Sequence, residues 1–92
     1  MTIDLESVND LTTEADVEGF IADGAPADEY ESEVEDVFAA LVALPAEKAT
    51  KEAIVAIYER VWAANFSLSD EDLLKRRGAF DGIAERILHH FG

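Results

Sequence analysis

The chain has 92 residues, of which 49% are hydrophobic, and it carries a formal net charge of −14 at pH 7. This length allows one domain with a modest core, spanning residues 1–92, and the apolar content is too high for a disordered acidic tail. The absence of cysteine excludes disulfides and thiolate zinc sites. No apolar run approaches the ~20 residues of a membrane span, and residues 1–4 lack the features of a signal peptide. A cytoplasmic location is therefore expected.

The excess charge belongs to one half of the chain. Residues 1–47 contain fourteen Asp or Glu and no Lys or Arg, whereas residues 48–92 contain seven acids and seven bases. Such a field disfavours nucleic acid and anionic membranes and favours a basic protein partner. Adaptation of a whole proteome to high salt is the alternative explanation. Such adaptation would spread acids over the surface, whereas residues 70–86 mix both signs.

The helical signal is weakest before the break at Gly24-Ala25-Pro26. Thr12 or Thr13 can cap a helix that Gly24 would end. Residues 1–11 fit a helical turn and an extended arm equally well. The inward positions of the predicted helix are Val17, Phe20 and Ile21.

A second helix follows the break and ends before Pro45. Two possible capping boxes overlap at its start, Asp28–Glu31 and Ser32–Glu35. The acids there also suit the positive end of the helix dipole. The apolar face at helical spacing comprises Tyr30, Val34, Val37, Phe38, Leu41 and Val42.

A third helix is predicted from Thr50 to about Asn65. Apolar residues surround it almost completely, which is typical of a central helix or of half of an interface. Burial within one molecule of Val55, Ala56, Ala63 and Ala64 would favour the central position. Its main stripe comprises Ile54, Ile57, Tyr58, Val61 and Trp62, which favours core positions for the two aromatic residues.

Ser69 begins the fourth helix, and Gly78 and Gly82 lie one turn apart on it, which can permit close helix approach. The basic run Lys75–Arg77 has an acid one turn from each member, so we expect it to be largely neutralised. The apolar stripe comprises Leu73, Phe80, Ala84, Ile87, Leu88 and Phe91. The sequence thus predicts an all-α fold, a small bundle of three firm helices and a weaker N-terminal one.

The start of the second helix is the candidate partner-binding surface. Tyr30 stands among acids and is expected to be partly exposed, and an aromatic anchor ringed by acids suits a basic partner. The candidate residues are Asp28, Glu29, Tyr30, Glu31, Glu33, Glu35 and Asp36.

Other chemistry has less support in the sequence. Asp81, Glu85 and His89 lie on one helix face, where they can hold a divalent metal with help from another helix. The simpler interpretation is that His89 and His90 interact with the helix C-terminus. No Gly-x-Ser-x-Gly elbow and no phosphate-binding loop is present, so neither an enzyme nor a cofactor site is expected.

The order Asp23-Gly24-Ala25-Pro26-Ala27-Asp28-Glu29-Tyr30, followed by an acidic amphipathic helix, resembles a small bacterial family of uncharacterised helical proteins. The later turn Asn65-Phe66-Ser67-Leu68 is similar too. The resemblance implies an all-helical fold and no particular activity. In size, charge and helicity the chain is also similar to bacteriocin-type immunity proteins, which is an analogy of fold alone.

Three hypotheses of function result. The first is an immunity or inhibitor module whose acidic face docks on a basic protein. The second is a structural or regulatory subunit that forms a homodimer or another assembly through its apolar third helix. The third is a metal-binding protein centred on Asp81, Glu85 and His89.

Overall fold

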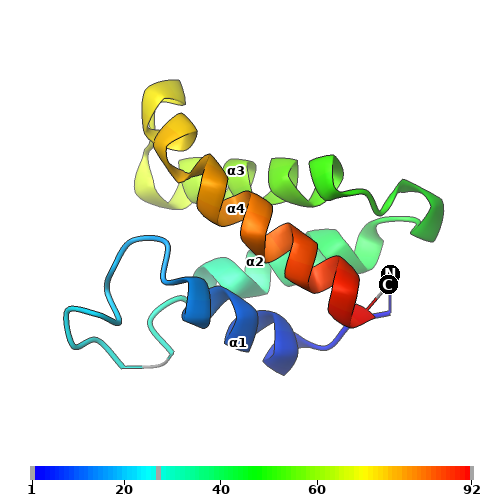
Figure 1. Cartoon of the computed structure of the whole chain (residues 1–92), viewed down its shortest axis with the longest axis horizontal. Coiled ribbons are helices and arrows are strands. Elements are labelled where there is room, and N and C mark those ends of the chain that lie inside the picture. Colours follow the sequence, from blue (N-terminus) through cyan, green and yellow to red (C-terminus); the bar gives the residue numbers. More distant parts are fainter. Residues whose placement is uncertain (1, 27, 92) are drawn as a thin grey trace.

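The computed structural model describes residues 2–26 and 28–91, which form four α-helices and one short 3-10 helix (Figure 1). These residues contain no strand, so the predicted all-α bundle is confirmed. The helices are α1 (Leu5–Ala15), α2 (Glu31–Ala43), η1 (Ala46–Lys48), α3 (Lys51–Phe66) and α4 (Asp70–Phe91).

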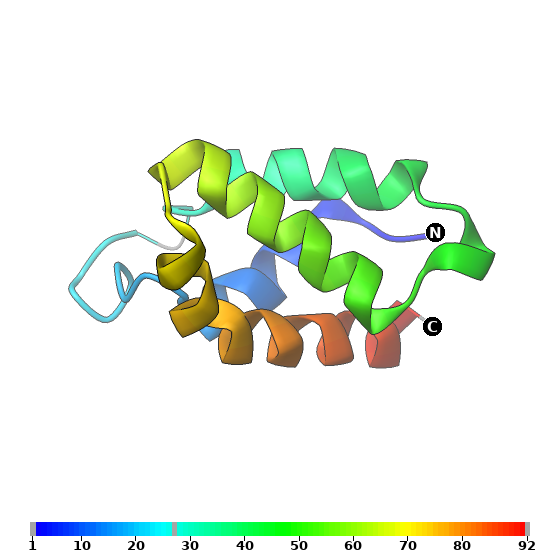
Figure 2. The same cartoon turned by 90° about the horizontal axis from the view of Figure 1, so that it is seen from above.

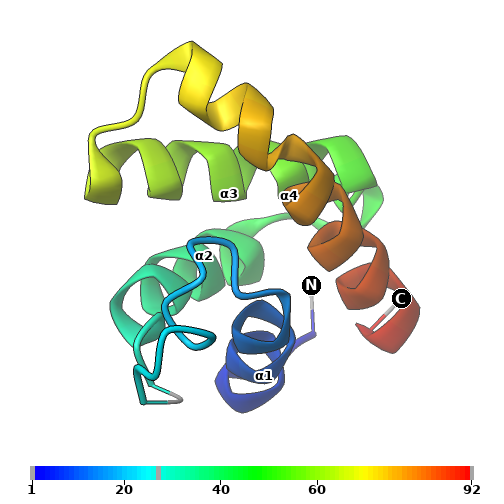
Figure 3. The ribbon, with the colours of Figure 1, turned by 60° about the vertical axis from the view of Figure 1, so that its left-hand side comes forward.

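The four α-helices pack in a closed cycle. α1 contacts α2 and α4, and α3 contacts the same two helices from the other side. Figure 2 shows α3 crossing between α2 and α4. Figure 3 shows the long connection between α1 and α2 lying beside these two helices, where it faces outward.

Three helices begin at side-chain caps. Asp4 Oδ1 accepts from Ser7 N at 2.8 Å at the start of α1, and Thr50 Oγ1 accepts from Ala53 N at 3.2 Å at the start of α3. Ser69 and Asp72 exchange two such bonds at the start of α4, which confirms the predicted start. These caps satisfy backbone N–H groups that a helix start leaves without partners.

The first helix lies earlier in the chain than its pattern predicted. A helix starting at Thr12 or Thr13 is wrong, because both residues lie inside α1. Thr12 is buried, and its hydroxyl bonds Val8 O at 2.8 Å and the Tyr58 hydroxyl at 2.7 Å. Residues 17–24 form turns, so Val17 and its apolar neighbours pack against the core from a connection.

The start of α2 also differs from the expectation. Tyr30 is the N-cap residue with no side-chain cap bond, and Ser32 lies inside the helix, so both predicted capping boxes are wrong. Backbone turns occupy the N–H groups instead, since Glu29 N donates to Pro26 O and Glu31 N to Asp28 O.

An aromatic cluster forms the centre of the core. The Trp62 ring lies 5.6–5.9 Å, centroid to centroid, from the rings of four neighbours, and the Trp62 and Tyr58 side chains have no exposed surface. The core position predicted for both residues is therefore confirmed. The four rings around Trp62 are those of Tyr30, Tyr58, Phe66 and Phe80.

The four apolar residues outside the main stripe of α3 differ in burial. Val55 is buried and Ala63 is half-buried, whereas Ala56 and Ala64 are exposed. The helix nevertheless supplies six buried side chains and packs against both α2 and α4. These contacts favour the central position over an interface.

The two glycines of α4 do not serve a close helix approach. A Cβ atom added at Gly78 or Gly82 would have no other atom within 4 Å. The close helix approach that these glycines can permit does not occur at either position, because each faces open space.

Candidate functional site

The acids at the start of α2 reach solvent, but the tyrosine among them does not. Glu33 is half-buried, and Tyr30 has no exposed surface. The expectation of a partly exposed Tyr30 is wrong, because its ring enters the core and stacks on Trp62 and Phe20. We use the name acidic surface for the exposed members: Asp28, Glu29, Glu31, Glu35 and Asp36.

No cation of the described chain neutralises the acidic surface. The ion pairs among residues 2–26 and 28–91 join Glu14 to Arg86, Glu18 to Arg76 and Glu85 to Lys51, and none includes an acid of this surface. Asp36 has a neutral neighbour, since Asn65 Nδ2 donates to Asp36 Oδ2 at 3.4 Å. The surface therefore keeps its negative field.

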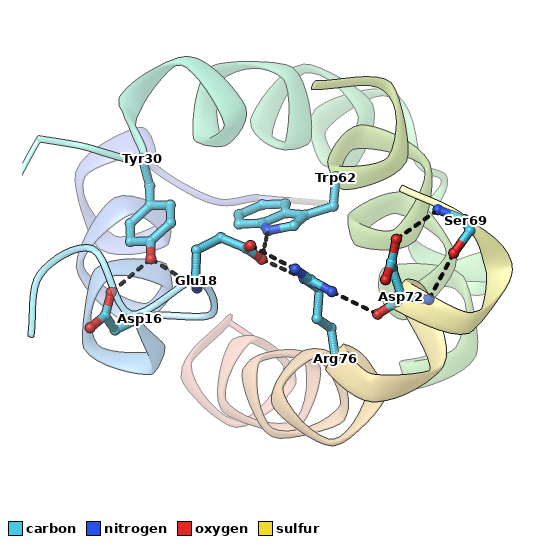
Figure 4. A network of polar contacts seen from close by, with 7 residues as sticks. All are labelled: Asp16, Glu18, Tyr30, Trp62, Ser69, Asp72 and Arg76. Carbon is cyan, nitrogen blue, oxygen red and sulfur yellow. Dashed lines mark hydrogen bonds and ion pairs between the residues drawn. The ribbon is translucent and has the colours of Figure 1, made fainter. Parts of the chain in front are cut away.

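Tyr30 instead holds the connection between α1 and α2 (Figure 4). Its hydroxyl donates to Asp16 Oδ1 at 2.7 Å and accepts from Glu18 N at 3.0 Å. Burial, followed by the bond to Asp16, raises the pKa of Tyr30 to about 12. The same bond, with the N–H groups of Ile21 and Ala22, lowers the pKa of Asp16.

Glu18 is the centre of a partly buried charge network (Figure 4). Its Oε2 atom accepts from Arg76 Nε at 2.5 Å and from Trp62 Nε1 at 3.1 Å, while Oε1 accepts from Arg76 Nη2 at 2.8 Å. Only 10% of the Glu18 side chain and 23% of the Arg76 side chain are exposed. The bonds from Arg76 hold the pKa of Glu18 below its usual range, and those from Glu18 raise the pKa of Arg76.

Arg76 bonds the carboxylate of Glu18 and not that of Asp72, the acid one turn before it on α4. The Asp72 carboxylate caps α4 through Ser69, and Arg76 reaches only the backbone oxygen of Asp72. Lys75 and Arg77 form no ion pair within the described chain. The expectation of a basic run neutralised by its own helix is therefore wrong.

The geometry gives the metal hypothesis no support. Glu85 is paired with Lys51 at 3.1 Å, and His89 is exposed. Within the described part of the chain, no three His, Asp or Glu side chains gather closely enough to hold a metal ion. A cavity of about 350 Å³ does open here, lined by Leu11, Glu85, Arg86, His89 and His90.

A second cavity lies between α1 and α2, and it joins the acidic surface through Glu31. We call it the α1–α2 pocket; its volume is about 340 Å³. The Oδ1 atom of Asn9 is enclosed and has no hydrogen-bond partner, and the same holds for Glu33 Oε2. The residues that line the pocket are Leu5, Glu6, Asn9, Glu31 and Val34.

Comparisons with known proteins give no relative for this chain: no family model, curated protein or solved structure matches it. The resemblance to a bacterial helical family stays a prediction. Across residues 2–26 and 28–91, every helix is either too short or too polar to traverse a lipid bilayer.

Proposed function

We propose that this protein acts by protein–protein contact, and that the acidic surface docks on a basic protein in the cytoplasm in the manner of an immunity or inhibitor module. One observation carries the proposal: the five acids of this surface are exposed and have no ion-pair partner within the described chain. Unpaired charge of one sign speeds the encounter with a partner of opposite sign.

The buried position of Tyr30 changes the form of the proposal. Its ring has no exposed surface, so a partner cannot contact it. The proposed contact therefore depends on carboxylates, with Glu33 at the margin. Because exposed charge pairs are screened by salt, we expect fast, salt-sensitive association.

Affinity capture from the source lysate at low and high salt tests the proposal. We expect the chain to retain a basic protein that salt releases, and a variant with Glu29→Lys, Glu35→Lys and Asp36→Lys to lose it. The matched control, Glu47→Lys, Glu52→Lys and Glu71→Lys, changes the net charge equally at exposed positions elsewhere. Equal capture by both variants, or capture that resists salt, would contradict the proposal.

The alternative is a structural or regulatory subunit that assembles through α3. The exposed Ala56 and Ala64 offer it little apolar area, because the exposed Glu52 and Arg60 lie on the same helix. Light scattering after size exclusion distinguishes the two proposals, since a salt-resistant homodimer is expected only from the alternative.

A further inference from the structure

The connection after α1 lies outside the cycle of helix contacts. We use the name strap for residues 16–26, the described part of this connection that follows α1. The four α-helices contact one another in a closed cycle without it. Every strap residue is half-buried or exposed, and none belongs to the buried core. The strap therefore lies on the bundle from outside, beside α1 and α2 (Figure 3).

The strap is folded on itself. Gly19 N donates to Asp16 O, and Asp23 N donates to Gly19 O. The Asp16 carboxylate accepts from Ile21 N and Ala22 N. These bonds join strap residues to one another, so they remain if the strap moves away from the helices. A compact loop that satisfies its own backbone groups in this way can move as one unit.

Two polar anchors hold the strap on the bundle. In the first, the Tyr30 hydroxyl donates to Asp16 and accepts from Glu18 N. In the second, the Glu18 carboxylate accepts from Arg76 and from Trp62 Nε1 (Figure 4). Glu18 thus belongs to both anchors. The strap also packs three partly buried apolar side chains against the core: Val17, Phe20 and Ile21.

We propose that the strap opens as a unit while the four helices stay packed, and that Glu18 holds it closed. In the closed form the Trp62 side chain has no exposed surface, and its N–H is bonded to Glu18. Opening would uncover this N–H and the Tyr30 hydroxyl. The bond between the Thr12 and Tyr58 hydroxyls, which joins α1 to α3, would remain. Because the buried core stays intact, opening requires less free energy than global unfolding.

The opened form differs from the closed form in what it presents to a partner. Tyr30 lies between Glu29 and Glu31 in the chain, and both are acids of the acidic surface. Opening would place an aromatic side chain beside these carboxylates, where the closed form offers carboxylates alone. A partner that binds the ring would then favour the opened form. The conformational change itself needs no partner, so it stands independently of the proposed function.

Hydrogen exchange of the Trp62 indole N–H measures the opening, because the chain has one tryptophan and its signal is unique. NMR of the ¹⁵N-labelled full chain follows this exchange in urea below the unfolding transition. After correction for intrinsic exchange rates, we expect a smaller opening free energy and a weaker dependence on urea than for the slowest backbone amides of α3. Exchange with the urea dependence of global unfolding would overturn the inference, because Trp62 would then be uncovered only when the helices separate.

Two tyrosine variants distinguish strap opening from global unfolding. Tyr30→Phe removes the hydroxyl of the first anchor, so the Trp62 indole should exchange about 5- to 10-fold faster. Tyr58→Phe is the matched control, because it also removes a buried hydroxyl, but one that bonds Thr12 of α1. The control should lower the melting temperature yet change indole exchange less than about twofold. Equal acceleration by the two variants would overturn the inference.

Glu18→Gln tests the residue that holds the strap closed. It should accelerate exchange of the Trp62 indole about 30- to 150-fold, because Arg76 loses its counter-charge in the closed form. Glu14→Gln is the control, since it breaks the pair with Arg86 between side chains that are 58% and 50% exposed. That change should alter indole exchange less than about twofold. Acceleration by Glu18→Gln no larger than that by Glu14→Gln would contradict the role given to Glu18.

Discussion

A single carboxylate joins three parts of the molecule. Glu18 belongs to the connection after α1, yet it accepts bonds from Trp62 of α3 and Arg76 of α4. A partly buried charge is stable only when such partners compensate for its lost hydration. The connection between α1 and α2 therefore depends on Glu18.

Glu18→Gln should lower the free energy of unfolding by about 2–3 kcal/mol, because it leaves the Arg76 guanidinium partly buried without its counter-charge. Urea unfolding at neutral pH measures the change. The control is Glu85→Gln, which breaks the Lys51 pair between side chains 39% and 64% exposed. That change should cost less than about 1 kcal/mol. Equal costs would show that the Glu18 network adds nothing beyond a surface pair.

The same variant isolates a pH dependence. The folded-state pKa of Glu18 is below its ordinary value of 4.5, so its stabilising contribution is complete above that value. The contribution is lost as the pH falls through the lower, folded-state pKa. The difference in unfolding free energy between wild type and Glu18→Gln should therefore shrink on acidification, in urea titrations from about pH 7 to about pH 3. A difference that grows on acidification would mean that the sign of this pKa shift is wrong.

Sequence reasoning had no access to the partners of these residues. Arg76 and Glu18 lie 58 positions apart, and Arg76 has a nearer acid, Asp72, at the usual helical spacing. The Asp72 carboxylate instead accepts a hydrogen bond from Ser69 N in the cap of α4. Tyr30 belongs to the apolar face of α2, and that periodicity correctly predicts an inward side chain. Its acidic neighbours in the sequence indicated exposure and were misleading.

At the scale of elements, the two glycines of α4 have no structural role that requires glycine. Neither has a positive φ angle, and an added Cβ would meet nothing within 4 Å. Glycine inside a helix loses more backbone entropy on folding than alanine does, and no packing contact at these two positions compensates for that loss. The structure thus gives no packing reason for either residue.

Gly78→Ala and Gly82→Ala should each stabilise the fold by about 0.5–1 kcal/mol. Thermal unfolding should show a rise of about 4–8 °C per kcal/mol for a chain of this size. Gly24→Ala is the control, since Gly24 has a φ of 101° and an alanine there is strained. A lower melting temperature for either α4 variant would mean that this face makes a contact which requires glycine.

The helix boundaries that the sequence predicts correctly are those with a strong local signal. Pro45, Thr50 and Ser69 marked α2, α3 and α4 to within a residue or two, because caps and breakers act locally. α1 was placed too late because its end depends on Asp16. This residue adopts a φ of 46° and binds the N–H groups of Ile21 and Ala22. The local signal for the start of α1 is Asp4, whose carboxylate caps the helix.

At the scale of the whole molecule, the charge asymmetry of the sequence is only partly corrected by folding. Two of the three ion pairs of the described chain bring a cation of α4 to an acid of the first half: Glu14 with Arg86 and Glu18 with Arg76. The five acids of the acidic surface receive none. Like charges held close in the folded state repel one another more than they do in the expanded unfolded chain.

Sodium chloride should therefore raise the melting temperature, with most of the rise complete by about 0.5 M, because the screening length has by then fallen well below 10 Å. The partly buried Glu18–Arg76 pair is screened less and limits the opposing loss. A variant with Glu29→Gln, Glu35→Gln and Asp36→Asn should melt higher at low salt and respond less to it. Calorimetry of both proteins across a salt series measures the effect; a melting temperature that falls with salt would show that attractive pairs, not the acidic surface, dominate the electrostatics.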